Sequence, residues 1–127
     1  MEHTAIWVKD LDGMKDFYCK YFDGTPNKLY HNPDKQFKSY FISFKAGTRL
    51  ELMHMPGIPD NQNNIKSQYK GIIHIAFSVG SKKQVDELTA RLKEDGHCMV
   101  SEPRTTGDGY YESCVLDPEG NIIEITI

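Results

Sequence analysis

His3-Thr-Ala-Ile6 and His74-Ile-Ala-Phe77 are two copies of one short pattern, and a second pattern repeats as Arg49-Leu-Glu-Leu52 and Ile122-Ile-Glu-Ile125. The two histidines lie 71 positions apart, and the two glutamates, Glu51 and Glu124, lie 73 positions apart. Self-similarity at a nearly fixed spacing is the mark of a repeated structural module. The duplication therefore predicts both the fold of the chain and a paired set of functional side chains.

Hydrophobic periodicity around these segments predicts the order β-α-β-β-β in each half. A strand is expected over 3–10, followed by a helix with Asp10 and Asp12 as candidate N-caps and Gly24 at its end. Ser81 and Gly96 are expected to bound the second helix. The other expected strands are 26–32, 37–45, 48–55, 72–79, 97–101, 110–116 and 121–127, with a turn at Ala46-Gly47, a loop over 103–109 and a turn over 117–120.

We therefore predict one α+β domain in which two βαβββ modules form a cup-shaped mixed sheet with the helices on its outer face. Module one is expected at 1–56, a polar and turn-rich linker at 57–70, and module two at 71–127. A chain of 127 residues is long enough to bury the core of one such domain.

Composition narrows the function classes. The net charge is −3 and the basic residues are scattered, so we expect no nucleic-acid partner. No apolar run approaches the roughly 20 residues that a membrane helix needs, and the first residues show no signal peptide. Cys19, Cys98 and Cys114 lack a CxxC spacing and are expected to be reduced thiols in a cytoplasmic protein.

Strand alternation sorts the repeated residues onto one face of the predicted sheets. His3, Glu51, His74 and Glu124 all fall on the more polar face of their strands, whereas the opposite faces are nearly all apolar. Each of these residues taken singly is more often a solvated side chain than a ligand. Their repetition in both halves favours a divalent metal site, because two imidazoles and two carboxylates form a typical ligand set.

Four stretches resemble the vicinal oxygen chelate superfamily, which includes glyoxalase I. They are HTAIWVKDLDGMKDFY at 3–18, LELM at 50–53, GIIHIAFSV at 71–79 and LDPEGNIIEI at 116–125. The last stretch fits the motif D-P-[DE]-G-x-x-I-E of that family, and the resemblance covers essentially the whole chain. It implies paired modules, a divalent metal that chelates two neighbouring oxygens of a small-molecule substrate, and in many members a homodimer.

Within the superfamily, two histidines and two glutamates are closest to the ligand set of glyoxalase I, the lactoylglutathione lyase. The resemblance implies that His3, Glu51, His74 and Glu124 are the metal ligands. It also implies that a glutamate, Glu51 or Glu124, leaves the metal to act as the base, and we assign this role to Glu124. Ni, Zn, Co, Mn and Fe all suit such a mixed nitrogen and oxygen set. The expected reaction isomerises an α-hydroxycarbonyl compound or a 2-oxoaldehyde–thiol adduct through an enediolate.

The expected substrate contacts depart from the family pattern. Bacterial glyoxalase I has a basic residue four positions after its first histidine ligand and an asparagine four positions after its first glutamate ligand, where this chain has Trp7 and Met55. Both contacts to glutathione are therefore missing, and a more apolar pocket is expected. The expected substrate-binding residues are Trp7, Met53, Met55, Arg104, Glu112 and Cys114. A core position for Cys114 and a solvated Arg104 stay open as alternatives.

Several functions stay open on this scaffold. Besides a glyoxalase I-like enzyme, the alternatives are a non-catalytic drug-binding or resistance protein, a thiol transferase that acts on an epoxide antibiotic, and an epimerase. His31, His54 and His97 have no counterpart in the other half and are not expected to bind the metal. The sequence also leaves open whether a metal site forms within one chain or across a dimer.

Overall fold

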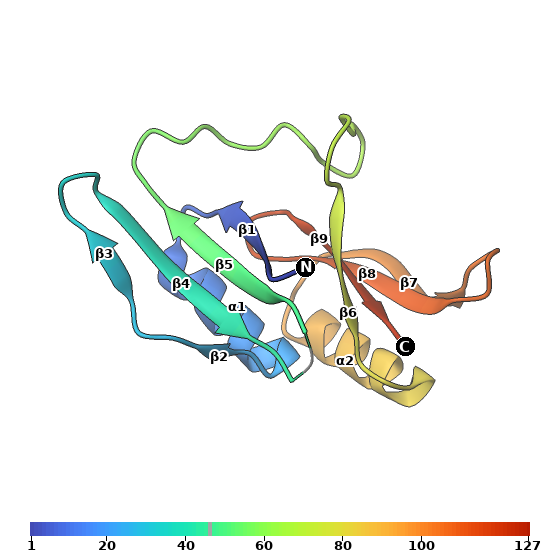
Figure 1. The fold of residues 1–127 in the computed structure, drawn as a ribbon. Coiled ribbons are helices and arrows are strands. Elements are labelled where there is room, and N and C mark those ends of the chain that lie inside the picture. Colours follow the sequence, from blue (N-terminus) through green and yellow to red (C-terminus); the bar gives the residue numbers. More distant parts are fainter. Residues whose placement is uncertain (46) are drawn as a thin grey trace. The chain divides into compact units, whose positions relative to one another are not determined.

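The computed structural model describes residues 1–45 and 47–127, and it divides the chain into two compact units, Met1–Asp60 and Asn61–Ile127 (Figure 1). Each unit contains one mixed β-sheet and one helix that packs against that sheet. The predicted α+β class with two related modules is confirmed. The division between the units falls within the segment 57–70, which contains neither helix nor strand in the structure.

The first unit contains a five-stranded sheet in which β1 is parallel to β5 and the remaining pairs are antiparallel. The strand order is β1-β5-β4-β2, and β3 also pairs with β4. The elements are β1 (His3–Trp7), α1 (Leu11–Phe22), β2 (Thr25–Pro26), β3 (Tyr30–Asn32), β4 (Phe37–Ser43) and β5 (Arg49–His54).

The second unit repeats this plan with a four-stranded sheet in the order β6-β9-β8-β7. β6 and β9, which are the first and last strands of this unit along the chain, are parallel neighbours, as β1 and β5 are in the first unit. β8 pairs antiparallel with both β9 and β7. The elements are β6 (His74–Ser78), α2 (Lys82–Glu94), β7 (Met99–Thr105), β8 (Tyr111–Leu116) and β9 (Ile122–Thr126).

Both helices begin at the residues that the sequence indicated. The side chain of Asp10 accepts a hydrogen bond from the backbone N–H of Gly13 at 3.0 Å, and Ser81 Oγ accepts one from the N–H of Gln84 at 3.2 Å. Each bond satisfies one of the N–H groups that a helix start leaves without an intrahelical partner. Both helices then bury their apolar stripes against the sheets; the buried members are Leu11, Met14, Phe17, Tyr18 and Tyr21 in α1, and Val85, Thr89 and Leu92 in α2.

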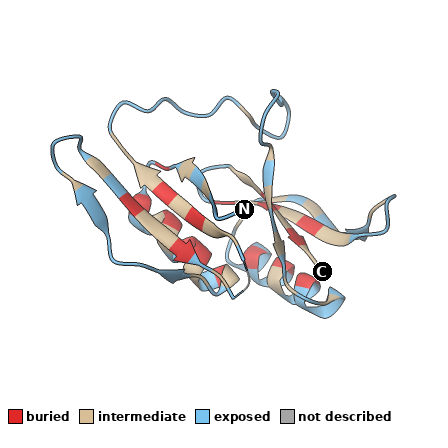
Figure 2. Cartoon of the chain, in the orientation of Figure 1, coloured by how far each residue is buried: buried red, intermediate tan, exposed pale blue. Residues whose placement is uncertain are grey.

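Each sheet has one face under its helix and one open face. On the helix side of β5 and β9, Leu50, Leu52, Ile123 and Ile125 are buried, while their alternate neighbours remain partly exposed. Figure 2 shows the buried positions gathered on the helices and on the strands beneath them. The open faces therefore carry the residues that are free to meet a ligand.

The end of α1 differs from the sequence prediction. Asp23, rather than Gly24, takes the left-handed conformation at the helix end, with φ of 53°. Gly24 is needed for another reason, because a Cβ atom there would lie 2.5 Å from Cγ2 of the buried Ile42 and 3.1 Å from the carbonyl oxygen of Tyr18. The glycine thus permits close packing of the chain against β4.

Two edge segments also differ from the prediction. The expected strand at 26–32 is divided into β2 and β3, and between them Asn27 exchanges hydrogen bonds with the backbone of Phe41 through its own N–H and its side-chain oxygen. The strand expected at 97–101 is observed as β7, which continues to Thr105 into the predicted loop. Pro103 is tolerated there because β7 is an edge strand whose register shifts at irregular positions.

The strand predicted over 3–10 ends at Trp7, three residues early, while the remaining predicted strands agree with the structure to within two residues at each end. Gly47 has a φ of 94°, in the left-handed region that favours glycine, whereas Ala46 of the predicted turn lies outside the described residues.

Candidate metal centre

The first histidine–glutamate pair lies on the open face of the sheet in the first unit. β1 and β5 are parallel, and Glu51 is the register partner of Ala5. This places His3 Nε2 at 3.7 Å from Glu51 Oε2, with the His3 side chain 38% exposed and the Glu51 side chain 15% exposed. The pair is thus partly shielded but open to a ligand from one side.

The second pair reproduces the first in the other unit. Glu124 of β9 is the register partner of Ala76 in β6, as Glu51 is of Ala5. The distance from His74 Nε2 to Glu124 Oε2 is again 3.7 Å, and the two side chains are 44% and 18% exposed. The sequence repeat is therefore also a repeat of atomic geometry, in which each unit presents one imidazole nitrogen and one carboxylate oxygen.

The geometry of each pair fits two ligands of one metal ion. A separation of 3.7 Å is too long for a direct hydrogen bond between nitrogen and oxygen. It is shorter than the roughly 4.2 Å available to two ligand atoms that each lie about 2.1 Å from an ion. Mixed imidazole and carboxylate ligands suit a first-row divalent metal, and the donor set contains no thiolate of the kind that marks structural zinc sites.

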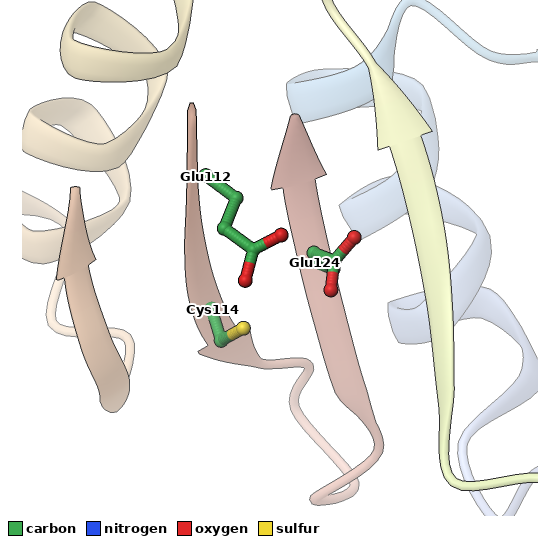
Figure 3. Close-up of side chains that lie close together, drawn as sticks. All are labelled: Glu112, Cys114 and Glu124. Atoms are coloured by element: carbon green, nitrogen blue, oxygen red, sulfur yellow. The ribbon is translucent and has the colours of Figure 1, made fainter. Parts of the chain in front are cut away.

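A third carboxylate and a thiol lie beside the second pair. One ligand atom each from Glu112, Cys114 and Glu124 fall within 4.8 Å of one another, and their side chains point to the same side of neighbouring strands β8 and β9 (Figure 3). Cys114 is the direct register partner of Glu124, as strand counting predicted. The structure therefore brings these three predicted site residues together.

The surroundings of Glu112 and Cys114 disfavour negative charge on both groups. Burial and the nearby Glu124 raise the pKa of the Glu112 carboxyl, against the opposing effect of Arg104. Arg104 lies opposite Glu112 on β7, with its guanidinium nitrogen 3.9 Å from the carboxylate. Burial raises the pKa of the Cys114 thiol as well. A bound cation would reduce the electrostatic repulsion between the Glu112 and Glu124 carboxylates at this close range.

The open face of the first sheet is more aromatic. Trp7, 42% exposed, is the register partner of Met53 and meets the ring of Phe37 edge to face, with the ring centroids 6.1 Å apart. The ring of Tyr30 meets the same Phe37 at 6.0 Å. Trp7 and Met53 therefore lie on the face that carries Glu51, as predicted, whereas Met55 follows the end of β5 and is partly buried.

Sequence reasoning missed the residues that surround His3. The Glu2 carboxylate contacts both His3 Nδ1 and the Arg49 guanidinium. These hydrogen bonds, the one to His3 foremost, hold the pKa of Glu2 below its usual range. In the sequence, Arg49 stands out only as the first residue of the strand that carries Glu51. Its contact with Glu2 could not be predicted without the register of β1 against β5.

The other histidines occupy different surroundings. His54 Nδ1 lies 3.0 Å from the carbonyl oxygen of Val8, within hydrogen-bonding distance at the end of β5. His31 is exposed in β3, and His97 follows the end of α2. Within the described residues, the histidine–glutamate pairs on the open sheet faces are those of His3 and His74.

Comparison with protein-family models decides the family. The model of the glyoxalase/bleomycin resistance protein/dioxygenase superfamily matches residues 1–125. The chain belongs to this superfamily. Its resemblance to the vicinal oxygen chelate proteins is thereby confirmed over nearly its whole length.

Three relatives of this chain share between 21% and 27% of its residues. An uncharacterised protein of Bacillus subtilis, YqjT, is 27% identical over 98% of this chain and 96% of its own length. The trypanothione-dependent glyoxalase I of Leishmania major is 26% identical with a TM-score of 0.77, covering 99% of this chain and 84% of that one. A glyoxalase family protein of Enterococcus faecalis, 21% identical, shares the fold with a TM-score of 0.80 over 100% of this chain and 96% of its own.

Members of this superfamily usually depend on a divalent metal. The cluster of possible ligand atoms in Glu112, Cys114 and Glu124 is compatible with a bound metal ion. Among the helices of the described residues, none is long and apolar enough to cross a membrane.

Proposed function

We propose that this protein is a metal-dependent enzyme of the glyoxalase I type, a lyase that isomerises a small 2-oxoaldehyde–thiol adduct or a related α-hydroxycarbonyl compound. The observation that carries the proposal is the histidine–glutamate pair that recurs with the same 3.7 Å spacing in both units. The recurrence of both residue types in the same register favours a metal-binding role over a binding protein that needs no metal.

We propose His3, Glu51, His74 and Glu124 as the four ligands of one divalent ion, with Ni, Zn, Co, Mn or Fe as candidates. Each unit contributes half of this set. A four-ligand octahedral site would keep two positions for neighbouring oxygens of a substrate. When bound, the ion would polarise a substrate carbonyl and stabilise the negative charge that develops on its oxygens.

Glu124 is the proposed base. Its carboxylate removes the proton from the carbon beside the substrate carbonyl and returns it to the neighbouring carbon, so that the substrate is isomerised with no net loss of atoms. Glu112 and Cys114 lie on the same face within reach of Glu124. Glu51 is the equivalent group in the other unit and the alternative base.

The proposed substrate has a thiol portion different from glutathione. Trp7 and Met55 stand where the basic and asparagine contacts of bacterial glyoxalase I would be, so a charged thiol of that type would lose two partners. The Trp7 and Met53 side chains line the open face of β1 and β5. We therefore expect an apolar contact on this side, with Arg104 and Glu112 as polar contacts from the second unit.

Turnover of the metal-loaded protein tests the assignment. The assay would supply methylglyoxal with a panel of thiols and, in parallel, epoxide and epimerase substrates. Glu124→Gln is expected to lower kcat by at least about 100-fold, because general-base catalysis commonly contributes that much. Glu87→Gln is the matched control, since Glu87 is exposed on α2 and pairs with Lys83. Undiminished turnover by Glu124→Gln would refute the role of Glu124.

The second candidate is a non-catalytic protein that binds a planar drug. The edge-to-face contacts among Trp7, Phe37 and Tyr30 favour it, because exposed aromatic rings are suited to stack on flat ligands. This function would be favoured by a protein that lacks stoichiometric metal and shows no turnover, and whose Trp7 fluorescence changes when a planar antibiotic binds. Turnover of an epoxide with a thiol would instead favour the thiol transferase.

We also propose that the protein acts as a cytoplasmic homodimer with no nucleic-acid or membrane partner. The net charge of −3 gives no support to nucleic-acid binding. Light scattering after gel filtration would measure the mass in solution, and a mass of about 14.6 kDa would contradict the dimer.

A further inference from the structure

The two histidines of the repeated pairs differ in the contact that their Nδ1 atoms make, on the side of the ring away from the paired glutamate. His3 has Glu51 near its Nε2 and the Glu2 carboxylate on its Nδ1. For His74, the described part of the chain shows Glu124 near Nε2 but records no carboxylate on Nδ1. The positions equivalent to Glu2 and Arg49 in the second unit are Ile73 and Ile122. The first unit thus carries a polar support that the second unit lacks.

Glu2 is itself held in place by Arg49. The guanidinium of Arg49 binds the second oxygen of the Glu2 carboxylate, and the backbone N–H of Arg49 donates to the carbonyl oxygen of Glu2 at 3.0 Å. Arg49 is also the register partner of His3. Residues of both β1 and β5 therefore fix the orientation of Glu2. This restrains the Glu2 side chain more than a single exposed ion pair would.

The ring of Phe41 completes the support. The guanidinium of Arg49 lies 4.3 Å from the Phe41 ring centroid, and the His3 ring meets Phe41 edge to face with a centroid distance of 5.3 Å. Phe41 is in turn the register partner of Glu51. Glu2, His3, Phe41 and Arg49 form a closed circuit of contacts, which we name the His3 bracket.

We propose that Glu2 is a positioning residue that accepts the Nδ1–H of His3 and so leaves Nε2 unprotonated and aimed at Glu51, ready to bind a metal. A metal-binding histidine commonly donates its second ring N–H to a carboxylate or carbonyl, which fixes the tautomer and the ring orientation. The inference rests on the proposed metal-binding function, which it deepens. It predicts that the metal-binding nitrogen of His3 is selected before any metal binds.

The direct test is the tautomer of His3 in metal-free protein. Two-bond proton–nitrogen correlation spectra of protein with ¹⁵N-labelled histidine, at about pH 8 where an unperturbed imidazole is neutral, report which nitrogen carries the proton. His3 signals are assigned by their loss in His3→Gln. We expect the Nδ1–H tautomer for His3 in the wild type. We expect a shift toward the Nε2–H tautomer in Glu2→Ile, which copies the residue at position 73.

Three variants make the test specific. Glu2→Gln keeps an oxygen that accepts from Nδ1–H and is expected to retain the wild-type tautomer. Arg49→Ile is expected to act in the same direction as Glu2→Ile, because the carboxylate loses its anchor. Glu102→Ile removes an equally exposed carboxylate that pairs with Lys93 and is expected to change nothing at His3. His74 signals should stay unchanged in all of them.

Metal affinity gives the second readout. Competition with a chelating dye is expected to show about 10-fold weaker binding for Glu2→Ile, in line with the usual effect of removing such a support. Identical His3 tautomers in wild type and Glu2→Ile would overturn the proposal, even if the protein binds metal. A tautomer shift in a protein that binds no metal would support the bracket and refute the proposed metal-binding function.

Discussion

At the scale of residues, the two histidine–glutamate pairs share their geometry but not their neighbours. His3 and Glu51 lie among aromatic rings and the Glu2–Arg49 pair, whereas Glu124 lies against Glu112 and Cys114. The pairs themselves could be predicted, because a repeat reveals them without knowledge of the fold. The role of Glu2 could not, because this residue precedes the strand and its partner Arg49 depends on the register between β1 and β5.

Cys114 reports on the candidate metal centre through its reactivity. Burial raises the pKa of the Cys114 and Cys19 thiols, so the thiolate fraction of each is smaller at neutral pH and grows as the pH rises toward the raised pKa. Cys98 is exposed. Mass spectrometry after iodoacetamide treatment is expected to show Cys98 alkylated first at about pH 7.5, where thiolate abundance and access limit the rate.

Metal binding should slow the alkylation of Cys114 alone, because its sulfur lies in the cluster with Glu124. Cys19, in α1, serves as the internal control. Alkylation of Cys114 as fast as that of Cys98, with no response to added metal, would contradict the position assigned to Cys114.

A buried pair of hydroxyls joins α2 to its sheet. The Thr89 hydroxyl donates to the carbonyl oxygen of Val85 at 2.6 Å, and Ser113 Oγ lies 2.6 Å from the same Thr89 oxygen. A carbonyl cannot donate, so Ser113 must donate to Thr89. Thr89→Val is therefore expected to cost about 1–3 kcal/mol in urea unfolding, because it leaves the buried Ser113 hydroxyl unpaired.

Ser113→Ala should cost less, since Thr89 keeps its bond to Val85. The double variant should be more stable than the sum of the two single losses predicts, because it leaves no unpaired hydroxyl donor. Additive losses in the double variant would show that the two hydroxyls are not coupled.

At the scale of elements, the sequence predicted the helices and central strands well and the edge strands β2, β3 and β7 poorly. Asp10 and Ser81 provide local capping signals, and β5 and β9 alternate cleanly between faces. Edge strands pair on one side only, so their extent depends on a neighbour that local sequence does not reveal. This explains why Pro103 was assigned to a loop and why the interruption at Asn27 was missed.

Gly24 and Gly96 follow the two helices for different physical reasons. A Cβ at Gly24 would collide with Ile42, whereas Gly96 has a φ of 86° and open space around it. Alanine at either position should cost about 1–3 kcal/mol by overpacking or by left-handed strain. Asparagine separates the causes: Gly96→Asn should be milder than Gly96→Ala, and Gly24→Asn should be worse than Gly24→Ala, as measured by thermal unfolding.

The same ranking at both positions would contradict this division. A Gly24→Asn protein as stable as Gly24→Ala would show that the packing against β4 has more room than the structure indicates.

At the scale of the whole molecule, each unit carries one half of the proposed ligand set, and a mixing experiment distinguishes a site within one chain from a site shared by two. His3→Ala and His74→Ala each remove one ligand. If a site combines the first unit of one chain with the second unit of another, a mixed dimer contains one intact site and recovers about half of the metal binding per dimer. If each site lies within one chain, no mixture recovers any.

Mixed dimers would be prepared by refolding the two variants together, with each variant refolded alone as the control. The resemblance to the superfamily allows both arrangements, so either result fits the proposed four-ligand set. Full metal binding by each variant alone would contradict it.

The most direct test of the central claim is the metal affinity of the wild type beside the four variants His3→Ala, Glu51→Gln, His74→Ala and Glu124→Gln. Competition with a chelating dye and elemental analysis would measure the affinity and the stoichiometry. The account predicts one divalent ion per chain in the wild type and clearly weaker binding in every variant. Wild-type affinity in both variants of either unit would contradict a site built from the two repeats.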